Sequence, residues 1–248
     1  SEGYSMGNLN IFASLLALAA AAPVMAQDKA AAEEATGPWS GNVSAGYLAT
    51  TGNAESSSAN FDFEAAYTSG AWNHALSGRA FGASADDETT AEAYQAGWKS
   101  TYDFNERNYA FGALDWNANR FAGFTRQTFA TLGYGRRVLT GSRFFLNLEV
   151  GVGYAKQKPK TGDSQSGGSG TLGAEFIWAL SDTSEFSQRL NVFATSDNTF
   201  SESISKVSTS LIGNVALAVS YTVRRNTDVP PDTQKTDTLT AISLEYGF

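Results

Sequence analysis

Residues 240–248, TAISLEYGF, end the chain with a strict alternation of two kinds of side chain. Successive side chains of an extended strand point to opposite faces, so this stretch has one mostly apolar face, formed by Thr240, Ile242, Leu244, Tyr246 and Phe248. Glu245 lies on the other face with small residues. A strand with one apolar and one polar face is typical of a transmembrane β-barrel, in which every second residue contacts lipid. The ending therefore predicts a strand of such a barrel.

The last strand also carries aromatic side chains close to the chain end, at Tyr246 and Phe248. A terminal aromatic residue on a strand of this kind resembles the signal that the bacterial barrel-assembly machinery recognises. We therefore expect Tyr246 and Phe248 to form an assembly signal, with that machinery as a partner during biogenesis. Such a signal would indicate an outer-membrane location, and it indicates no activity.

The beginning of the chain predicts export. Residues 6–26, MGNLNIFASLLALAAAAPVMA, have an apolar core followed by a small-residue cleavage motif at Val24-Met25-Ala26. The core is too short and too soon interrupted for a spanning helix, which favours a signal peptide over residues 1–26. One element of a signal peptide is missing, because no Lys or Arg precedes the core. A buried N-terminal helix is the alternative interpretation. We expect residues 27–38 to form a flexible periplasmic tail and residues 39–248 the barrel.

The composition excludes several protein classes. The chain has no cysteine, so its fold does not depend on disulfides. Beyond the signal, no apolar stretch approaches the length of about 18 residues that a spanning helix needs. A membrane barrel can have a mean hydropathy as low as the observed −0.24, because only alternate residues face lipid. The net charge of −8 argues against a nucleic-acid binder, which would need a basic surface.

From Trp39 onward the sequence reads as consecutive strands separated by Gly, Asn, Asp and Ser. Residues 204–223 are long enough for a single strand, but this would give an odd count and would leave Phe248 outside the cell. Single-chain bacterial barrels have an even number of strands, so we divide the segment at Gly213-Asn214. The prediction is an all-β, antiparallel up-and-down barrel of about 12 strands, with ten or fourteen as alternatives. The longest polar loops are expected at residues 156–170 and 226–234.

The polar faces of the predicted strands carry charges that lipid would not tolerate. Exposing Asp62 or Glu64 to lipid would cost several kcal/mol, so both should point into the lumen. By the same reasoning we expect a charged lumen lining formed by Asp62, Glu64, Arg79, Lys99, Asp103, Glu149, Glu175, Arg189 and Glu245. A soluble sandwich or lipocalin-like barrel is the alternative fold, but it would place its large apolar side chains inside. Opposite charges paired across the lumen would close it, whereas an acidic excess would favour cations.

Little in the sequence indicates catalysis or ligand binding. His74 is the one histidine, and a membrane phospholipase-like hydrolase using it is an alternative function, although no motif marks a partner serine. We expect no catalytic, cofactor or metal site; Asp86-Asp87-Glu88 could hold a cation but reads better as a solvated loop. Binding or adhesion through the two long polar loops is a further alternative. Aromatic residues near strand ends predict an interfacial girdle, formed by Trp72, Tyr102, Phe104, Tyr109 and Tyr246.

Several short segments, in order along the chain, carry a family resemblance. They are Trp39-Ser40-Gly41, Gly46-Tyr47-Leu48, Thr51-Gly52-Asn53, residues 106–109 (ERNY), 111–115 (FGALD), 133–137 (GYGRR), 196–200 (SDNTF), 228–231 (DVPP) and 235–238 (KTDT). The stretch from Trp39 to Phe248 resembles the YdiY-like family of salt-induced outer-membrane proteins, a family of unknown function. The resemblance implies an outer-membrane location and, by name, a link to salt or osmotic stress. It transfers no catalytic residue.

The expected protein is thus a non-enzymatic barrel of the outer membrane, acting as a narrow or plugged channel or as an envelope protein. Its expected partners are outer-membrane lipid and lipopolysaccharide. The sequence leaves its oligomeric state open.

Overall fold

The structure is a computed structural model that describes residues 37–50, 56–86, 88–120, 122–231 and 234–248. The predicted signal peptide, nearly all of the predicted tail and the predicted turn at Thr51-Gly52-Asn53 lie outside the described residues. Within the described ranges, no helix is long and apolar enough to cross a membrane.

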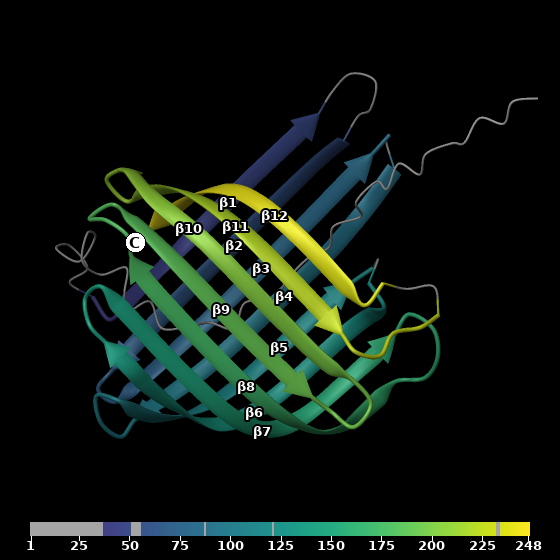
Figure 1. Cartoon of the computed structure of the whole chain (residues 1–248), viewed down its shortest axis with the longest axis horizontal. Helices are drawn as coiled ribbons and strands as arrows, with labels where there is room; N and C mark the ends of the chain where they lie inside the picture. Colours follow the sequence, from purple (N-terminus) through teal and green to yellow (C-terminus); the bar gives the residue numbers. More distant parts are fainter. Residues whose placement is uncertain (1–36, 51–55, 87, 121, 232–233) are drawn as a thin grey trace, which may run out of the picture.

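Twelve antiparallel strands close into a single barrel, which confirms the predicted fold (Figure 1). Each strand pairs with the next in sequence, and the last pairs with the first. The strands are β1 (Trp39–Thr50), β2 (Ser56–Ser69), β3 (Trp72–Ala85), β4 (Glu88–Asp103), β5 (Asn108–Asn119), β6 (Phe124–Thr140), β7 (Phe144–Pro159), β8 (Gln165–Ala179), β9 (Ser184–Ala194), β10 (Thr199–Ile212), β11 (Val215–Asn226) and β12 (Thr236–Gly247).

The predicted division of residues 204–223 is confirmed. Strand β10 ends at Ile212 and β11 begins at Val215, with Gly213 and Asn214 between them. Gly213 has a φ of 53°, a backbone conformation that glycine adopts at little cost because it has no Cβ. The turn brings the two strands into antiparallel register and gives the even strand count.

The predicted long loop at residues 156–170 is wrong. Strand β7 continues to Pro159 and β8 begins at Gln165, so only residues 160–164 connect them. Lys156 pairs with Ser166 and Gln157 pairs with Gln165 across the extended hairpin. Backbone hydrogen bonds hold a ladder together whatever the side chains are, so Gly- and Ser-rich composition did not prevent strand formation here.

The outer wall of the barrel is apolar and its interior is polar. Large apolar side chains are exposed along the outside, with Leu132 and Val152 each 71 % accessible. Ile242, Leu244, Tyr246 and Phe248 are exposed as the alternation predicted, whereas Glu245 is buried. A soluble barrel has the opposite polarity, so the outer wall is suited to contact with lipid.

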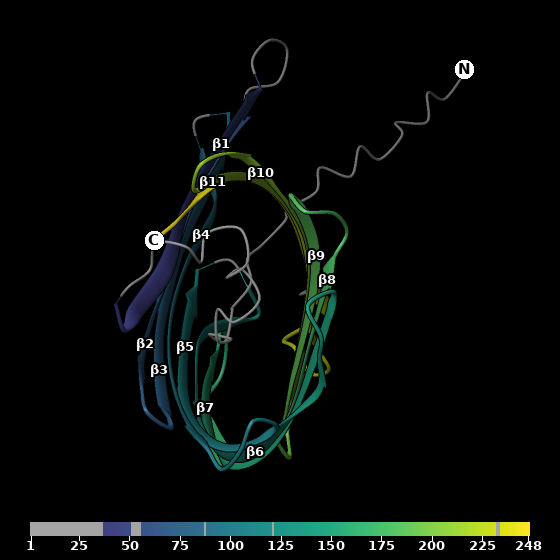
Figure 2. The same ribbon diagram turned by 90° about the vertical axis from the view of Figure 1, so that its left-hand side faces the viewer.

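The barrel is flattened, and β2–β5 face β8–β10 across the interior, with β6 and β7 closing one side (Figure 2). Trp39 and Phe248 lie at one end of the barrel, where backbone hydrogen bonds join Gly41 to Phe248. We call this the terminal end. The opposite end, which carries the connections at residues 160–164 and 195–198, is called the loop end.

Candidate functional site: the barrel interior

Ion pairs between strands that are not neighbours cross the interior of the barrel. Lys99 Nζ on β4 lies 2.5 Å from Glu149 Oε1 on β7. Arg189 on β9 lies 3.8 Å from Glu64 on β2, on the opposite wall. Because two strands separate β4 from β7, and more separate β9 from β2, these contacts run through the space that an open pore would occupy.

The structure brings all nine residues of the predicted charged lining into ion pairs. The pairs that contain them are Asp62–Arg79, Glu64–Arg189, Glu175–Arg189, Lys99–Glu149, Asp103–Arg137 and Glu245–Lys206. Arg189 joins two carboxylates at once, on β2 and on β8. Each of the nine predicted charges therefore has a partner of opposite sign inside the barrel.

The interior contains further charged residues that were not predicted from the sequence, among them the buried Asp115. Arg137 pairs with Asp103, Lys206 pairs with Glu245, and Arg224 pairs with Glu202 at 3.1 Å. Arg224 and Glu202 are almost fully buried on the neighbouring strands β11 and β10. Strand alternation could have found Glu202 and Lys206, because they lie on the face opposite the exposed Val207.

The half of the interior lined by β4–β7 is filled. Tyr109 and Phe111 on β5 lie over Gly135 and Gly133 on β6, to which they are paired in register. Any Cβ at either glycine would meet the facing ring, so these glycines provide the space that the rings occupy. We call this side, which also holds the Lys99–Glu149 pair, the filled half.

The prediction that Tyr109 belongs to an interfacial girdle is wrong. Tyr109 is only 1 % exposed, and its hydroxyl donates a hydrogen bond to Glu149 Oε1 at 2.5 Å. The amide of Asn147 in turn donates to the Tyr109 hydroxyl at 2.5 Å. The other members of the predicted girdle, Trp72, Tyr102, Phe104 and Tyr246, are exposed on the outer wall. Tyr109 differs because its position in β5 places it on the inner face, where hydrogen-bond partners replace water.

Three phenylalanine rings from different walls meet near the loop end. Phe129 on β6 stacks on Phe193 on β9 with ring centroids 4.4 Å apart, and Phe200 on β10 lies 6.2 Å from Phe129. The Arg224 guanidinium lies over the Phe200 ring, 5.4 Å from its centroid. These buried rings, which we call the aromatic cluster, obstruct the interior between β6 and β9–β10.

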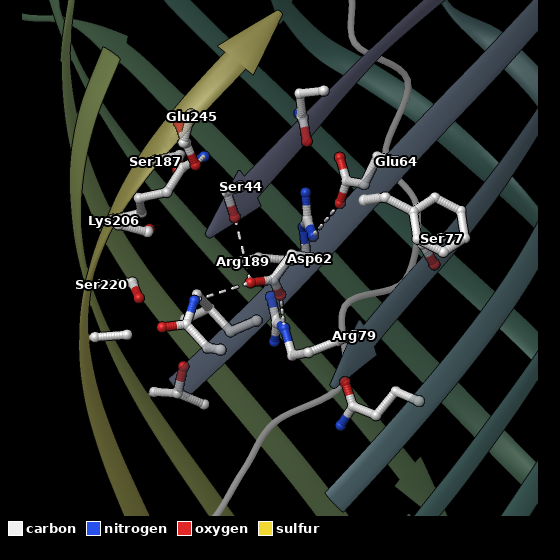
Figure 3. Close-up of a pocket in the computed structure, with 18 of the residues that line it drawn as sticks. Ser44, Asp62, Glu64, Ser77, Arg79, Ser187, Arg189, Lys206, Ser220 and Glu245 are labelled. Atoms are coloured by element: carbon white, nitrogen blue, oxygen red, sulfur yellow. Dashed lines mark hydrogen bonds and ion pairs between the residues drawn. The ribbon is translucent and has the colours of Figure 1, made fainter. Parts of the chain in front are cut away.

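The half of the interior lined by β1–β3 and β8–β12 is more open. It contains a cavity of about 110 Å³, whose wall includes Asp62, Glu64, Arg79, Arg189, Lys206 and Glu245. Figure 3 shows these charged side chains, with Ser44, Ser77, Ser187 and Ser220, converging on one space from several strands. The small serine side chains leave room that larger residues would occupy. We call this side the open half and its cavity the large cavity.

His74 has a partner that the sequence analysis did not find. The register pairs His74 on β3 with Ser100 on β4, and Ser100 Oγ lies 2.9 Å from His74 Nδ1. Trp72 stacks on the imidazole, with ring centroids 5.8 Å apart. His74 shares the outer face of β3 with the exposed Trp72 and Leu76. Register between strands is what joins His74 to Ser100, and no local motif encodes it.

The predicted acidic loop at Asp86-Asp87-Glu88 lies only partly within the described residues. Asp86 follows β3, Glu88 already belongs to β4, and Asp87 lies outside the described residues. Within the described ranges, no three His, Asp or Glu side chains form a group that could hold a metal ion.

Residues 43–248 match the model of a family described as "Protein of unknown function, DUF481". The chain belongs to this family. The DUF481 chain is also 32 % identical over 239 residues to the uncharacterized protein YdiY of Escherichia coli (strain K12), across 96 % of this chain and 94 % of that protein. The family resemblance inferred from the motifs is thereby confirmed.

Solved barrels resemble the DUF481 chain only distantly. The KdgM porin aligns with a TM-score of 0.48 and 10 % identity, over 84 % of this chain and 99 % of that one. The NanC porin aligns with a TM-score of 0.49 and 7 % identity, over 83 % and 97 %. The translocator domain of the autotransporter NalP from Neisseria meningitidis aligns with a TM-score of 0.48 and 12 % identity, over 88 % and 91 %.

Proposed function

We propose that the protein is a non-enzymatic outer-membrane barrel whose interior is a narrow, largely closed conduit for small polar solutes. The observation that carries the proposal is the set of ion pairs in the open half, which surround a cavity of about 110 Å³. A polar cavity surrounded by paired charges suits small solutes that form hydrogen bonds. An open porin would need a continuous wide lumen instead.

The apolar outer wall supports the proposed location. Its exposed Leu, Val and aromatic side chains would contact lipid, whereas the charges lie inside. Lipid and lipopolysaccharide would then surround the barrel, and the assembly machinery would recognise Tyr246 and Phe248. Fractionation of cells that make the full chain tests this: the protein should sediment with the outer membrane, and recovery in the soluble fraction would contradict the proposal.

Conductance of the refolded barrel in planar lipid bilayers tests the proposed conduit. The native chain should give small, discrete steps. Arg189→Ala removes the contact between β9 and β2 and should enlarge the steps, because the two walls lose their common bridge. Arg126→Ala, an exposed residue of β6, is the matched control and should leave them unchanged. Absence of steps in both the native chain and Arg189→Ala would overturn the proposal.

We further propose a link to salt stress, which rests on the family resemblance and on the interior charges. Added salt screens ion pairs that water reaches, so the partly accessible pairs Asp62–Arg79 and Lys206–Glu245 should weaken. Conductance should then rise more steeply with salt concentration than the conductivity of the solution does. A strictly proportional rise would remove this physical support.

A hydrolase is the second candidate, favoured by the hydrogen bond between His74 and Ser100. A serine nucleophile needs a neighbouring base, which His74 could supply. The base also needs an orienting partner, and in the described part of the chain no carboxylate accepts a hydrogen bond from His74. Phospholipid hydrolysis that is present in the native chain and lost in both His74→Ala and Ser100→Ala would establish this function in place of the conduit alone.

A further inference from the structure

We propose that Gln95 is the constriction of the interior pathway and limits it to species about the size of a water molecule. This inference rests on the proposed conduit and adds the residue that sets its size limit. It follows from the positions of two cavities and from the side chain that lies between them.

A second, smaller cavity lies toward the loop end. Its volume is about 10 Å³, and its lining includes Asn117, Gln127, Phe200, Arg224 and Asp237. A space of this size accommodates about one water molecule. We call it the small cavity.

Among the described residues, Gln95 is the one that lines both cavities. The strand register explains its position: Gln95 on β4 pairs with Arg79 on β3 and with Asn117 on β5. Arg79 lines the large cavity and Asn117 lines the small one. Gln95 therefore lies at the boundary between the two spaces.

The strands β11 and β12 show a boundary at a matching position. Thr222 and Leu239 are paired in register and line the large cavity. The next pair of inward-facing residues along these strands, Arg224 and Asp237, lines the small cavity. On both walls, therefore, the lining changes from the large cavity to the small one between two consecutive inward-facing positions. A short, narrow neck at Gln95 fits this arrangement.

The side chain of Gln95 also lacks the partners that a purely structural amide would have. It is only 6 % exposed, and neither its Nε2 nor its Oε1 has a hydrogen-bond partner among the described residues. Buried amides are normally satisfied, because leaving one unpaired is costly. A donor and an acceptor at the neck suit a passing water molecule or hydroxyl group, which can bind both.

The experiment measures water, glycerol and ion flux through the refolded full chain in vesicles and planar bilayers. The native chain should pass water faster than empty vesicles do, and it should exclude glycerol. Gln95→Ala joins the two cavities and should admit glycerol and raise ion conductance several-fold. Gln95→Met keeps the length of the side chain but removes both polar atoms, and it should slow water flux without admitting glycerol.

Thr101→Val is the matched control. Thr101 lies on the same strand and the same inner face, it is also buried with an unpartnered polar atom, and it lines neither cavity. Its flux should equal that of the native chain. Refolding is judged by the heat-modifiable mobility of the barrel on gels. If Gln95→Ala fails to refold, it is replaced by Gln95→Asn, which shortens the side chain by one methylene.

The possible outcomes separate the inference from the function on which it rests. If Arg189→Ala increases conductance but Gln95→Ala behaves as the native chain does, the constriction lies elsewhere and the conduit stands. If Thr101→Val opens the barrel as much as Gln95→Ala does, the effect is general loosening and the inference is overturned. If no variant conducts or passes water, both proposals are wrong.

Discussion

The two halves of the barrel interior solve the same packing problem in opposite ways. In the filled half, glycines at positions 133 and 135 allow the rings of Phe111 and Tyr109 to lie across the neighbouring strand. In the open half, inner positions such as Ser187 and Ser220 carry small polar side chains, and a cavity of about 110 Å³ remains. The difference shows that the sizes of the inward residues on paired strands, more than the strand count, decide how much of the interior stays open.

The same substitution in each half should give the largest contrast. Lys99 Nζ pairs with Glu149 in the filled half, where its side chain is 8 % exposed, whereas Lys206 of the open half is 27 % exposed. Lys99→Met leaves a carboxylate buried without its counter-charge, and it should lower the free energy of unfolding by about 3–5 kcal/mol. Lys206→Met should cost less, about 1 kcal/mol, because the Lys206 side chain is the more accessible of the two lysines and its pair with Glu245 borders the large cavity.

Urea-induced unfolding of the refolded barrels in lipid measures both losses. Combining Lys99→Met with Glu149→Gln should recover part of the stability, since the stranded charge is removed. Equal losses for the two lysine variants would show that the halves do not differ in their access to water.

A glycine comparison tests the packing itself. A Cβ at Gly135 would meet the Tyr109 ring, whereas a Cβ at Gly247 on β12 would meet nothing within 4 Å. Gly135→Ala should therefore lower the free energy of unfolding by about 1–3 kcal/mol through overpacking. Gly247→Ala should change it by about 0.5 kcal/mol or less. Thermal unfolding followed by circular dichroism compares the two, and a neutral Gly135→Ala would mean that the Tyr109 ring shifts freely.

Removing one oxygen atom isolates the hydrogen bonds of the filled half. Tyr109→Phe keeps the ring but leaves Glu149 without one donor and the Asn147 amide without its acceptor. The expected loss is about 1–2 kcal/mol in the free energy of unfolding. Tyr154→Phe, on the exposed outer wall, is the control and should be close to neutral. If both variants lose the same amount, the inner hydroxyl contributes no more than an outer one does.

The smallest expected effect on stability comes from making the open half resemble the filled one. Ser220→Leu places an apolar side chain in the large cavity and should alter the free energy of unfolding by about 1 kcal/mol or less. Conductance should nevertheless fall, because the side chain occupies the pathway. Ser201→Leu, on the outer face of the neighbouring strand β10, should leave conductance unchanged. Equal conductance in both variants would place the pathway outside the large cavity.

Strand alternation was sufficient to predict the architecture. The pattern in residues 240–248, the even count and the turn at Gly213 led to the predicted twelve strands, which the structure confirms. The alternation and the turn are local features, because each depends on one strand or one turn, whereas the even count is a general rule for such barrels. The error at residues 156–170 arose where composition was given more weight than the capacity of any backbone to pair.

The contacts within the interior were harder to predict, since they depend on which strands face each other. Nothing near Tyr109 in the sequence shows that Gly135 will lie opposite it on β6. Its inner position could have been recognised, because Tyr109 shares its face of β5 with Asp115 and Asn117. The Arg189–Glu64 contact joins opposite walls, and only the closed, flattened barrel brings these side chains together.

The junction of β1 and β12 has a consequence for the order of assembly. Its strand register covers the four positions from Asn42 to Ala45, with Gly41 and Phe248 bonded just beyond them, whereas β1 and β2 pair along twelve. Every other junction joins strands that follow each other in the chain and can form early as hairpins, but this one must bring the two ends of the barrel together. Closure is therefore expected to be the slow final event of folding, and this junction should part first under heat or force. The Phe248 ring lies against Gly41, and the backbones of the two residues are hydrogen-bonded to each other. Removal of Phe248 should therefore change the lifetime of the closed barrel.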